Sequence, residues 1–146
     1  DIYNIISNES EKKAEEELKE SEKGESNVIV VTQNDKKEVM QIIYFDFDGS
    51  TLSQVSKNTL INFLNKNKNR LSRYIIFGHT DTKGAYDYNL NLSLKRAQAV
   101  KEILLNQGIF EKNVSVLGKG ENQLAVNTPD ETKHPANRRA EVKILN

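Results

Sequence analysis

The sequence predicts an α/β fold of the α+β type, a two-layer sandwich in which a mixed sheet carries both of its helices on one face. Two observations predict it. Short runs of β-branched and aromatic residues alternate with two longer segments of helical periodicity, in the order β-β-α-β-α-β-β. The chain has 146 residues, enough for one domain with a real core but too few for a doubly wound nucleotide-binding fold.

The first two predicted strands form a β-hairpin. The runs VIVVT (28–32) and EVMQIIYF (38–45) are rich in strand-forming residues, and the polar segment QNDKK between them is typical of a turn. We therefore expect the folded domain to occupy residues 28–146.

The first predicted helix covers residues 53–71. Ser53 is a plausible N-cap, because a serine hydroxyl can accept a hydrogen bond from a free amide of the first turn. Apolar residues recur along the segment at roughly helical spacing: Val55, Leu60, Phe63, Leu64 and Leu71. A buried strand, RYIIFGHT (73–80), follows and ends in a glycine and polar residues.

The second predicted helix, residues 93–108, has the clearest pattern in the chain. Ser93 can cap it and Gly108 can close it. Its apolar face consists of Leu94, Ala97, Val100 and Leu104. Two further strands follow, VSVLGKG (114–120) and RRAEVKIL (138–145), and the long polar loop between them holds both prolines.

Residues 1–27 are expected to form a charged leader or tether. Within them, residues 9–26 are almost wholly polar, with glutamate and lysine at helical spacing. A solvated helix is the alternative, but only Ala14 and Leu18 would give it an apolar face.

The composition excludes several classes of function. The 21 basic and 21 acidic side chains cancel, so no global field recruits nucleic acid or an acidic membrane surface. Without cysteine there is no disulfide framework and no thiolate metal site. No apolar run approaches the roughly 20 residues that span a bilayer, and no signal peptide is visible at Asp1. We expect membrane contact only through a segment absent from this chain.

The stretch YFDFDGSTL (44–52) resembles the first motif of haloacid-dehalogenase-type phosphotransferases, in which the first aspartate is the nucleophile. Such an enzyme also needs a late acidic pair that completes a magnesium site. No aspartate pair follows a later hydrophobic strand, and Ser50 displaces the motif's threonine by one position. We therefore expect Asp46 not to act as a nucleophile, and phosphotransfer remains an alternative.

A carboxylate and a guanidinium are predicted to meet at one rim of the sheet. Asp81 follows the strand 73–80, and Arg96 falls in the first turn of the predicted helix 93–108, where the helix dipole disfavours a cation. Two interpretations stay open. The pair is either a structural salt bridge or a site for a zwitterion, in which Asp81 binds an ammonium and Arg96 a carboxylate.

The segment GHTDTKGAYDYNLNLSLKRAQAVKEILLNQG (78–108) resembles the OmpA-like peptidoglycan-binding domain. The matching residues are Thr80-Asp81, Gly84, Tyr88-Asn89, Leu92-Ser93, Arg96-Ala97, Val100 and Gly108, followed by GKG at 118–120 and NRRAEV at 137–142. The resemblance covers about residues 38–145. It implies a domain that catalyses nothing, needs no cofactor or metal, and binds the diaminopimelate residue of the peptidoglycan stem peptide non-covalently.

The resemblance also implies the residues of the site. Asp81 would accept the diaminopimelate ammonium and Arg96 would bind its carboxylate. The backbone amides of Phe47 and Asp48 would help to bind that carboxylate. The wall would be completed by Thr80, Asn89, Leu92 and one arginine of the pair 138–139. Neighbouring strand residues face opposite ways, so only one of the two can point into the site, and we favour Arg138.

The same resemblance implies a protein in the periplasm of a Gram-negative bacterium, tethered to the outer or inner membrane, and it is compatible with a homodimer. A protein–protein interaction module of the envelope is an alternative function. His79 and His134 suggest a metal site but lack an evident third ligand. Tyr86 and Tyr88 suggest carbohydrate stacking, although packing against the loop or the pocket rim is the simpler interpretation.

Overall fold

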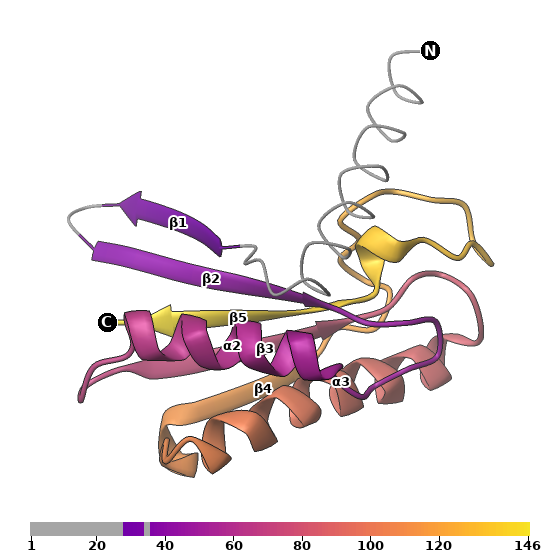
Figure 1. The fold of residues 1–146 in the computed structure, drawn as a ribbon. Helices are drawn as coiled ribbons and strands as arrows, with labels where there is room; N and C mark the ends of the chain where they lie inside the picture. Colours follow the sequence, from indigo (N-terminus) through magenta and orange to yellow (C-terminus); the bar gives the residue numbers. More distant parts are fainter. Residues whose placement is uncertain (1–27, 34–35) are drawn as a thin grey trace.

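The computed structural model describes residues 28–33 and 36–146. The predicted leader, residues 1–27, lies outside the described residues. The predicted order of strands and helices is confirmed (Figure 1). The elements are β1 (Val28–Gln33), β2 (Lys36–Tyr44), α2 (Gln54–Asn67), β3 (Arg73–His79), α3 (Tyr86–Asn106), β4 (Val114–Gly118) and β5 (Arg139–Leu145), with short 3₁₀ turns η1 (Glu111–Asn113) and η2 (Pro135–Asn137).

The strands form one mixed sheet in the order β1-β2-β5-β3-β4. Only β3 and β4 run parallel, with Tyr74 opposite Val114, and the crossover between them contains α3. The last strand, β5, lies centrally, because it pairs antiparallel with both β2 and β3. This topology brings the ends of β2 and β3 and the start of β5 to the same edge of the sheet.

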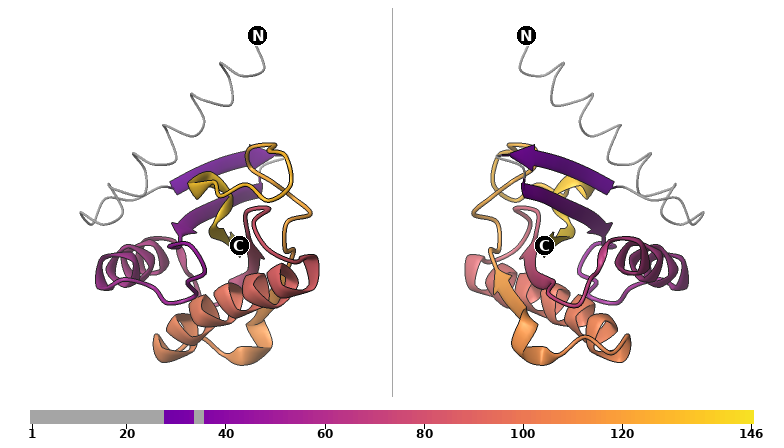
Figure 2. Two further views of the ribbon diagram at one scale, coloured as in Figure 1. Left: turned by 90° about the vertical axis from the view of Figure 1, so that its right-hand side faces the viewer. Right: turned by 90° about the vertical axis from the view of Figure 1, so that its left-hand side faces the viewer.

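Both helices cover the same face of the sheet, as the end-on views show (Figure 2). Alternate residues of β2, β3, β4 and β5 point to that face, as the pleat of a strand requires. Together they form the main core with the helices: Val39, Ile43, Phe45, Leu52, Leu60, Phe63, Leu64, Tyr74, Ile76, Ala97, Val100, Leu104, Val114, Ala140, Val142 and Ile144. On the opposite face, the segment between β4 and β5 buries a smaller cluster of Tyr44, Val126 and Ala136.

Gly78 lets α3 pack directly on β3. A Cβ atom at this position would lie 1.8 Å from the carbonyl oxygen of Ser93. The absence of a side chain at Gly78 therefore allows the backbone of α3 to lie directly against the end of β3. This close approach positions the middle of α3 beside the polar residues that follow β3.

The second helix begins earlier than the sequence pattern predicts. It starts at Tyr86 with Ala85 as its N-cap residue, so the prediction that Ser93 caps it is wrong. Ser93 is instead buried within the helix, where its hydroxyl donates to the carbonyl of Leu90 and accepts from the amide of Gly120. The first two turns were missed because their apolar residues are sparse and they expose tyrosines to solvent.

The first helix ends earlier than predicted, at Asn67. Ser53 is its N-cap as expected, accepting a hydrogen bond from the amide of Ser56 at 3.1 Å. Leu71, assigned to the apolar face of the helix, lies beyond its end and is 82% exposed. Neither helix of the described part of the chain is both long and apolar enough to cross a membrane.

Candidate functional site

A cavity of about 240 Å³ lies where β2 and β3 end and α3 passes. Residues of four segments, most of them polar or charged, line it: Phe47, Asp48, Asp81, Lys83, Gly84, Tyr88, Asn89, Leu92, Arg96 and Arg138. The turn after β2, the loop after β3, the first half of α3 and the residue before β5 thus meet at one place. The sheet topology makes them neighbours, although they are far apart in the sequence.

Arg96 is fully buried at the edge of this cavity. Its Nε donates to the carbonyl of Gly49 at 2.7 Å, Nη1 to that of His79 at 2.8 Å, and Nη2 to that of Asp46 at 3.2 Å. Its guanidinium also lies 5.3 Å from the ring centroid of Phe45. Burial lowers the pKa of Arg96 to about 10, partly offset by the charge of Asp81, so the guanidinium stays charged at neutral pH.

The turn at residues 46–49 is held in place by Arg96. The amide of Gly49 donates to the carbonyl of Asp46 at 3.0 Å and closes the turn. Asp48 occupies the left-handed region, with φ of 58°, which residues other than glycine, asparagine and aspartate seldom adopt. Its carboxylate accepts a hydrogen bond from the hydroxyl of Tyr88, and this bond raises the pKa of the tyrosine.

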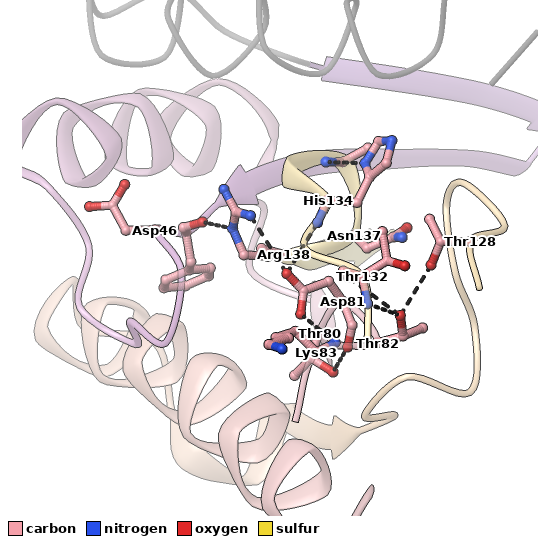
Figure 3. A network of polar contacts seen from close by, with 12 residues as sticks. Asp46, Thr80, Asp81, Thr82, Lys83, Thr128, Thr132, His134, Asn137 and Arg138 are labelled. Atoms are coloured by element: carbon pink, nitrogen blue, oxygen red, sulfur yellow. Dashed lines mark hydrogen bonds and ion pairs between the residues drawn. The ribbon is translucent and has the colours of Figure 1, made fainter. Parts of the chain in front are cut away.

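Asp81 is buried and its carboxylate is held by backbone amides. Oδ1 accepts from the amide of Lys83 at 3.1 Å, and Oδ2 accepts from the amide of His134 at 3.2 Å. Nη1 of Arg138 lies 3.6 Å from Oδ2, and Figure 3 shows the two side chains directed toward each other. Among the residues that the structure describes, no ion pair joins Asp81 to Arg96, which rules out the structural salt bridge considered from the sequence.

The loop between β4 and β5 packs against the loop after β3. The hydroxyl of Thr82 donates to the carbonyl of Pro129 at 2.7 Å. It also accepts from the amide of Thr132 at 3.0 Å (Figure 3). The side chain of Asn137 fixes the base of this loop through two hydrogen bonds of 2.9 Å to the backbone of Val126. The loop is therefore anchored both to the loop after β3 and at its base before β5.

The two arginines at the start of β5 point to opposite sides. Arg138 lines the cavity and donates from Nε to the carbonyl of Phe45 at 3.1 Å. Arg139 lies on the sheet face away from the helices, where its Nε donates to Glu141 at 2.8 Å. Arg138 precedes the strand and caps η2, so its position follows from that turn rather than from strand alternation alone.

Of the eight residues proposed from the sequence, all but Thr80 border the cavity. Thr80 is buried behind it, and its hydroxyl donates to the carbonyl of Asp81. The helix-dipole argument for Arg96 was wrong, because this residue lies about three turns inside α3. Three further lining residues are not among these eight: Lys83 and Gly84, which stand in the same TDTKG segment as Asp81, and Tyr88, for which packing at the pocket rim was one interpretation.

The features that suggested catalysis lie apart from the cavity. The carboxylate of Asp46 points away from Asp81 and Arg138 in Figure 3, and Asp46 enters the site only through its carbonyl. The ring of His79 is buried against Arg139 and Glu141 on the other face of the sheet, whereas His134 accepts from the amide of Ala136. Residues 28–33 and 36–146 contain no group of three histidine or acidic side chains that could hold a metal ion.

A larger hollow of about 520 Å³ adjoins the cavity and shares Gly84 with it. Its walls include Tyr86, Glu121, Asp130 and Glu131 but no basic residue. The cavity that holds Asp81 and Arg96 is therefore the better candidate for a ligand that carries both charges, and the larger hollow leaves room for the rest of such a ligand.

Known proteins resemble this chain in sequence. Residues 44–138 match the model of the OmpA family. A peptidoglycan-associated lipoprotein of Legionella pneumophila is 35% identical over 104 residues, covering 69% of this chain and 58% of the relative. One from Pseudomonas aeruginosa is 31% identical over 100 residues, covering 68% of this chain and 60% of the relative. The chain thus spans less than two thirds of the length of these relatives.

Solved structures share the fold. The peptidoglycan-associated lipoprotein of Burkholderia pseudomallei superposes with a TM-score of 0.63 at 28% identity, covering 71% of this chain and 89% of that structure. The OmpA-like domain of FopA1 from Francisella tularensis superposes with a TM-score of 0.66 at 23% identity, covering 81% of this chain and 79% of that one. The sequence match over both sides of the cavity, together with this shared fold, establishes that the chain belongs to the OmpA family.

Proposed function

We propose that this domain binds peptidoglycan non-covalently through the diaminopimelate residue of the stem peptide. The observation that carries the proposal is the presence of Asp81 and Arg96 at one small cavity, with Arg96 paired to no acidic side chain in the described structure. The names of the peptidoglycan-associated lipoprotein relatives support peptidoglycan as the ligand.

The chemistry of diaminopimelate fits these charges. Its side chain ends in an amino-acid head, with an ammonium and a carboxylate on one carbon atom. Asp81 would accept hydrogen bonds from the ammonium. Arg96 has N–H donors beyond those that the three carbonyl groups accept, and these would bind the carboxylate together with the backbone amides of Phe47 and Asp48.

The volume of the cavity supports a head group rather than a sugar chain. About 240 Å³ is below the usual range for sites that enclose drug-sized ligands, roughly 300–1,000 Å³. Asn89 and Leu92 would contact the aliphatic part of the side chain, and Arg138 would hold Asp81 in place. Thr80 would act from behind, by fixing the backbone at Asp81.

The biological role that follows is attachment of an envelope protein to the cell wall. We infer that the domain lies in the periplasm of a Gram-negative bacterium, tethered to the outer or inner membrane. The expected homodimer stays a prediction. Residues 1–27 would serve as the tether between that membrane and the wall.

The two alternative functions have less support. A phosphotransferase of the haloacid-dehalogenase type needs several carboxylates around magnesium, and Asp46 has no such neighbours among the described residues. A pure protein–protein interaction module would not require opposite charges at the edge of a cavity of this size. The family match favours neither alternative.

Co-sedimentation with isolated sacculi tests the proposal. The full chain should bind sacculi rich in diaminopimelate, and Asp81→Asn should bind at least about tenfold more weakly, because it loses a charge-assisted contact. Asp87→Asn is the matched control, since Asp87 is an exposed acid at the start of α3 that does not line the cavity. Equal binding by folded Asp81→Asn and the unaltered chain would overturn the assignment of the site.

A further inference from the structure

Lys133 contacts a residue that lines the cavity, because its Nζ atom lies 4.1 Å from the ring centroid of Phe47. It belongs to the segment 131–134, in which the amide of Glu131 donates to the carbonyl of Thr82 and the amide of His134 donates to Asp81. Asp81 also lines the cavity, so the backbone of this segment and the ammonium of Lys133 each contact a residue of the site.

The charge of Lys133 is not neutralised within the described part of the chain. Among residues 28–33 and 36–146, no acidic side chain forms an ion pair with its ammonium, whereas Lys83 pairs with Glu131 at 3.2 Å. Arg138 lies close to Asp81, and Asp48 accepts a hydrogen bond from Tyr88. Once a ligand carboxylate neutralises Arg96, Lys133 is a cation at the site that no acidic side chain of the described residues neutralises.

We propose that Lys133 is a specificity-determining residue that binds a second carboxylate of the ligand, one residue away from the amino-acid head in the cavity. The inference rests on the proposed function and names the chemical form of stem peptide that the site prefers. In a stem peptide of this type, the residue before diaminopimelate is a D-glutamate joined through its side-chain carboxyl. Its α-carboxylate is therefore free, unless the cell wall is amidated at that position.

The position of Lys133 fits this role. A head group buried between Asp81 and Arg96 leaves the rest of the peptide to cross the rim, where the ammonium lies over Phe47. The aromatic ring holds the ammonium in place without neutralising it, so a carboxylate can still bind. Phe47 is 45% exposed, and a charge pair at such a rim is screened by water. The expected preference is therefore modest, about three- to tenfold in affinity.

The test is a binding titration with two synthetic tripeptides, L-Ala-γ-D-Glu-meso-diaminopimelate and the same peptide carrying an amide at the glutamyl α-carboxyl. The unaltered full chain should bind the acid form about three- to tenfold more tightly. Lys133→Met keeps an apolar stem but removes the charge, so it should bind both forms with the affinity that the unaltered chain has for the amide. Lys133→Arg should keep the preference.

A matched control separates this effect from loss of a general positive field. Lys143 lies 5.4 Å from the ring centroid of Phe77 on the sheet face away from the helices, so Lys143→Met removes a similar contact far from the rim. It should leave the preference unchanged. If the unaltered chain and Lys133→Met both bind the two peptides equally well, the role of Lys133 is overturned while the proposed function stands. If the unaltered chain binds neither peptide, both proposals are overturned.

Discussion

The Nε atom of Arg96 donates a hydrogen bond to the carbonyl oxygen of Gly49 at 2.7 Å, which ties the middle of α3 to the turn after β2. Two further bonds, to the carbonyls of His79 and Asp46, tie the same guanidinium to the end of β3 and to the start of the turn. Arg96 therefore builds the cavity in addition to lining it. Its substitution should affect folding and binding together.

Arg96→Ala should lower the free energy of unfolding by about 2–4 kcal/mol, because it leaves buried carbonyl groups without donors. The free energy of unfolding of Arg96→Lys should lie between those of the unaltered chain and Arg96→Ala, since an ammonium cannot reproduce the planar arrangement of donors. Urea denaturation measures both. The control is Arg73→Ala, at an exposed position of β3, which should change stability by no more than about 0.5 kcal/mol. An unchanged midpoint for Arg96→Ala would contradict a structural role for this residue.

Gly78→Ala should be severely destabilising. The added methyl group would lie 1.8 Å from the backbone carbonyl of Ser93, so α3 must move away from β3 or the strand must distort. We expect a loss of about 3 kcal/mol or more, measured by thermal or urea unfolding. Gly108→Ala is the comparison, because its Cβ meets no atom within 4 Å and only the backbone strain at φ of 86° remains. Equal stability of the two variants would contradict the direct packing of α3 on β3 at Gly78.

The stability of the domain should depend on His79 below neutral pH. Burial, together with the positive charges of Arg139 and Lys119, lowers the pKa of His79 from 6.5 to about 3. The unfolded chain therefore takes up a proton as the pH falls below about 6.5, but the folded chain does so only near pH 3, and stability is lost across this range.

The measurement is urea denaturation of the unaltered chain and of His79→Gln at pH 7 and pH 4. The difference in stability between the two proteins should shift by about 2–3 kcal/mol in favour of the variant at the lower pH. Carboxylates that titrate in the same range affect both proteins and cancel in this difference. A constant difference between pH 7 and pH 4 would show that His79 takes up its proton at an ordinary pKa.

The turn at residues 46–49 should prefer glycine to alanine at position 48. Asp48 has a positive φ, which glycine adopts freely and a residue with a Cβ atom does not. Both Asp48→Gly and Asp48→Ala lose the bond to Tyr88, so their comparison isolates the backbone term. The glycine variant should be more stable by about 1 kcal/mol in equilibrium unfolding. Equal stability would mean that the turn relaxes to another conformation.

The sequence predicts the architecture well because its strands are short and strongly patterned. The hairpin of residues 28–44 and the apolar face around Ala97 and Val100 are visible as local periodicity. The start of α3 is not, because residues 86–92 are held by tertiary contacts such as that of Asn89 with the carbonyl of Lys83. Local helix propensity does not reflect such tertiary contacts.

Only part of the site is predicted, because local sequence patterns do not show the tertiary contacts that complete it. Asp81 and Arg96 belong to a contiguous motif, so the sequence places them near one edge of the sheet. Their actual partners are backbone groups and Arg138, brought together by the central position of β5. The contact of Lys133 with Phe47 joins segments far apart in the chain, and no local sequence pattern predicts it.

The central claim is that the cavity binds the amino-acid head of diaminopimelate, and one substitution in the ligand tests it directly. Equilibrium binding of the full chain should be compared for a tripeptide that ends in meso-diaminopimelate and for one that ends in L-lysine, which lacks the distal carboxylate. We predict at least about tenfold tighter binding of the diaminopimelate peptide, because only that peptide gives Arg96 a carboxylate partner. Equal affinity for the two peptides would contradict the account.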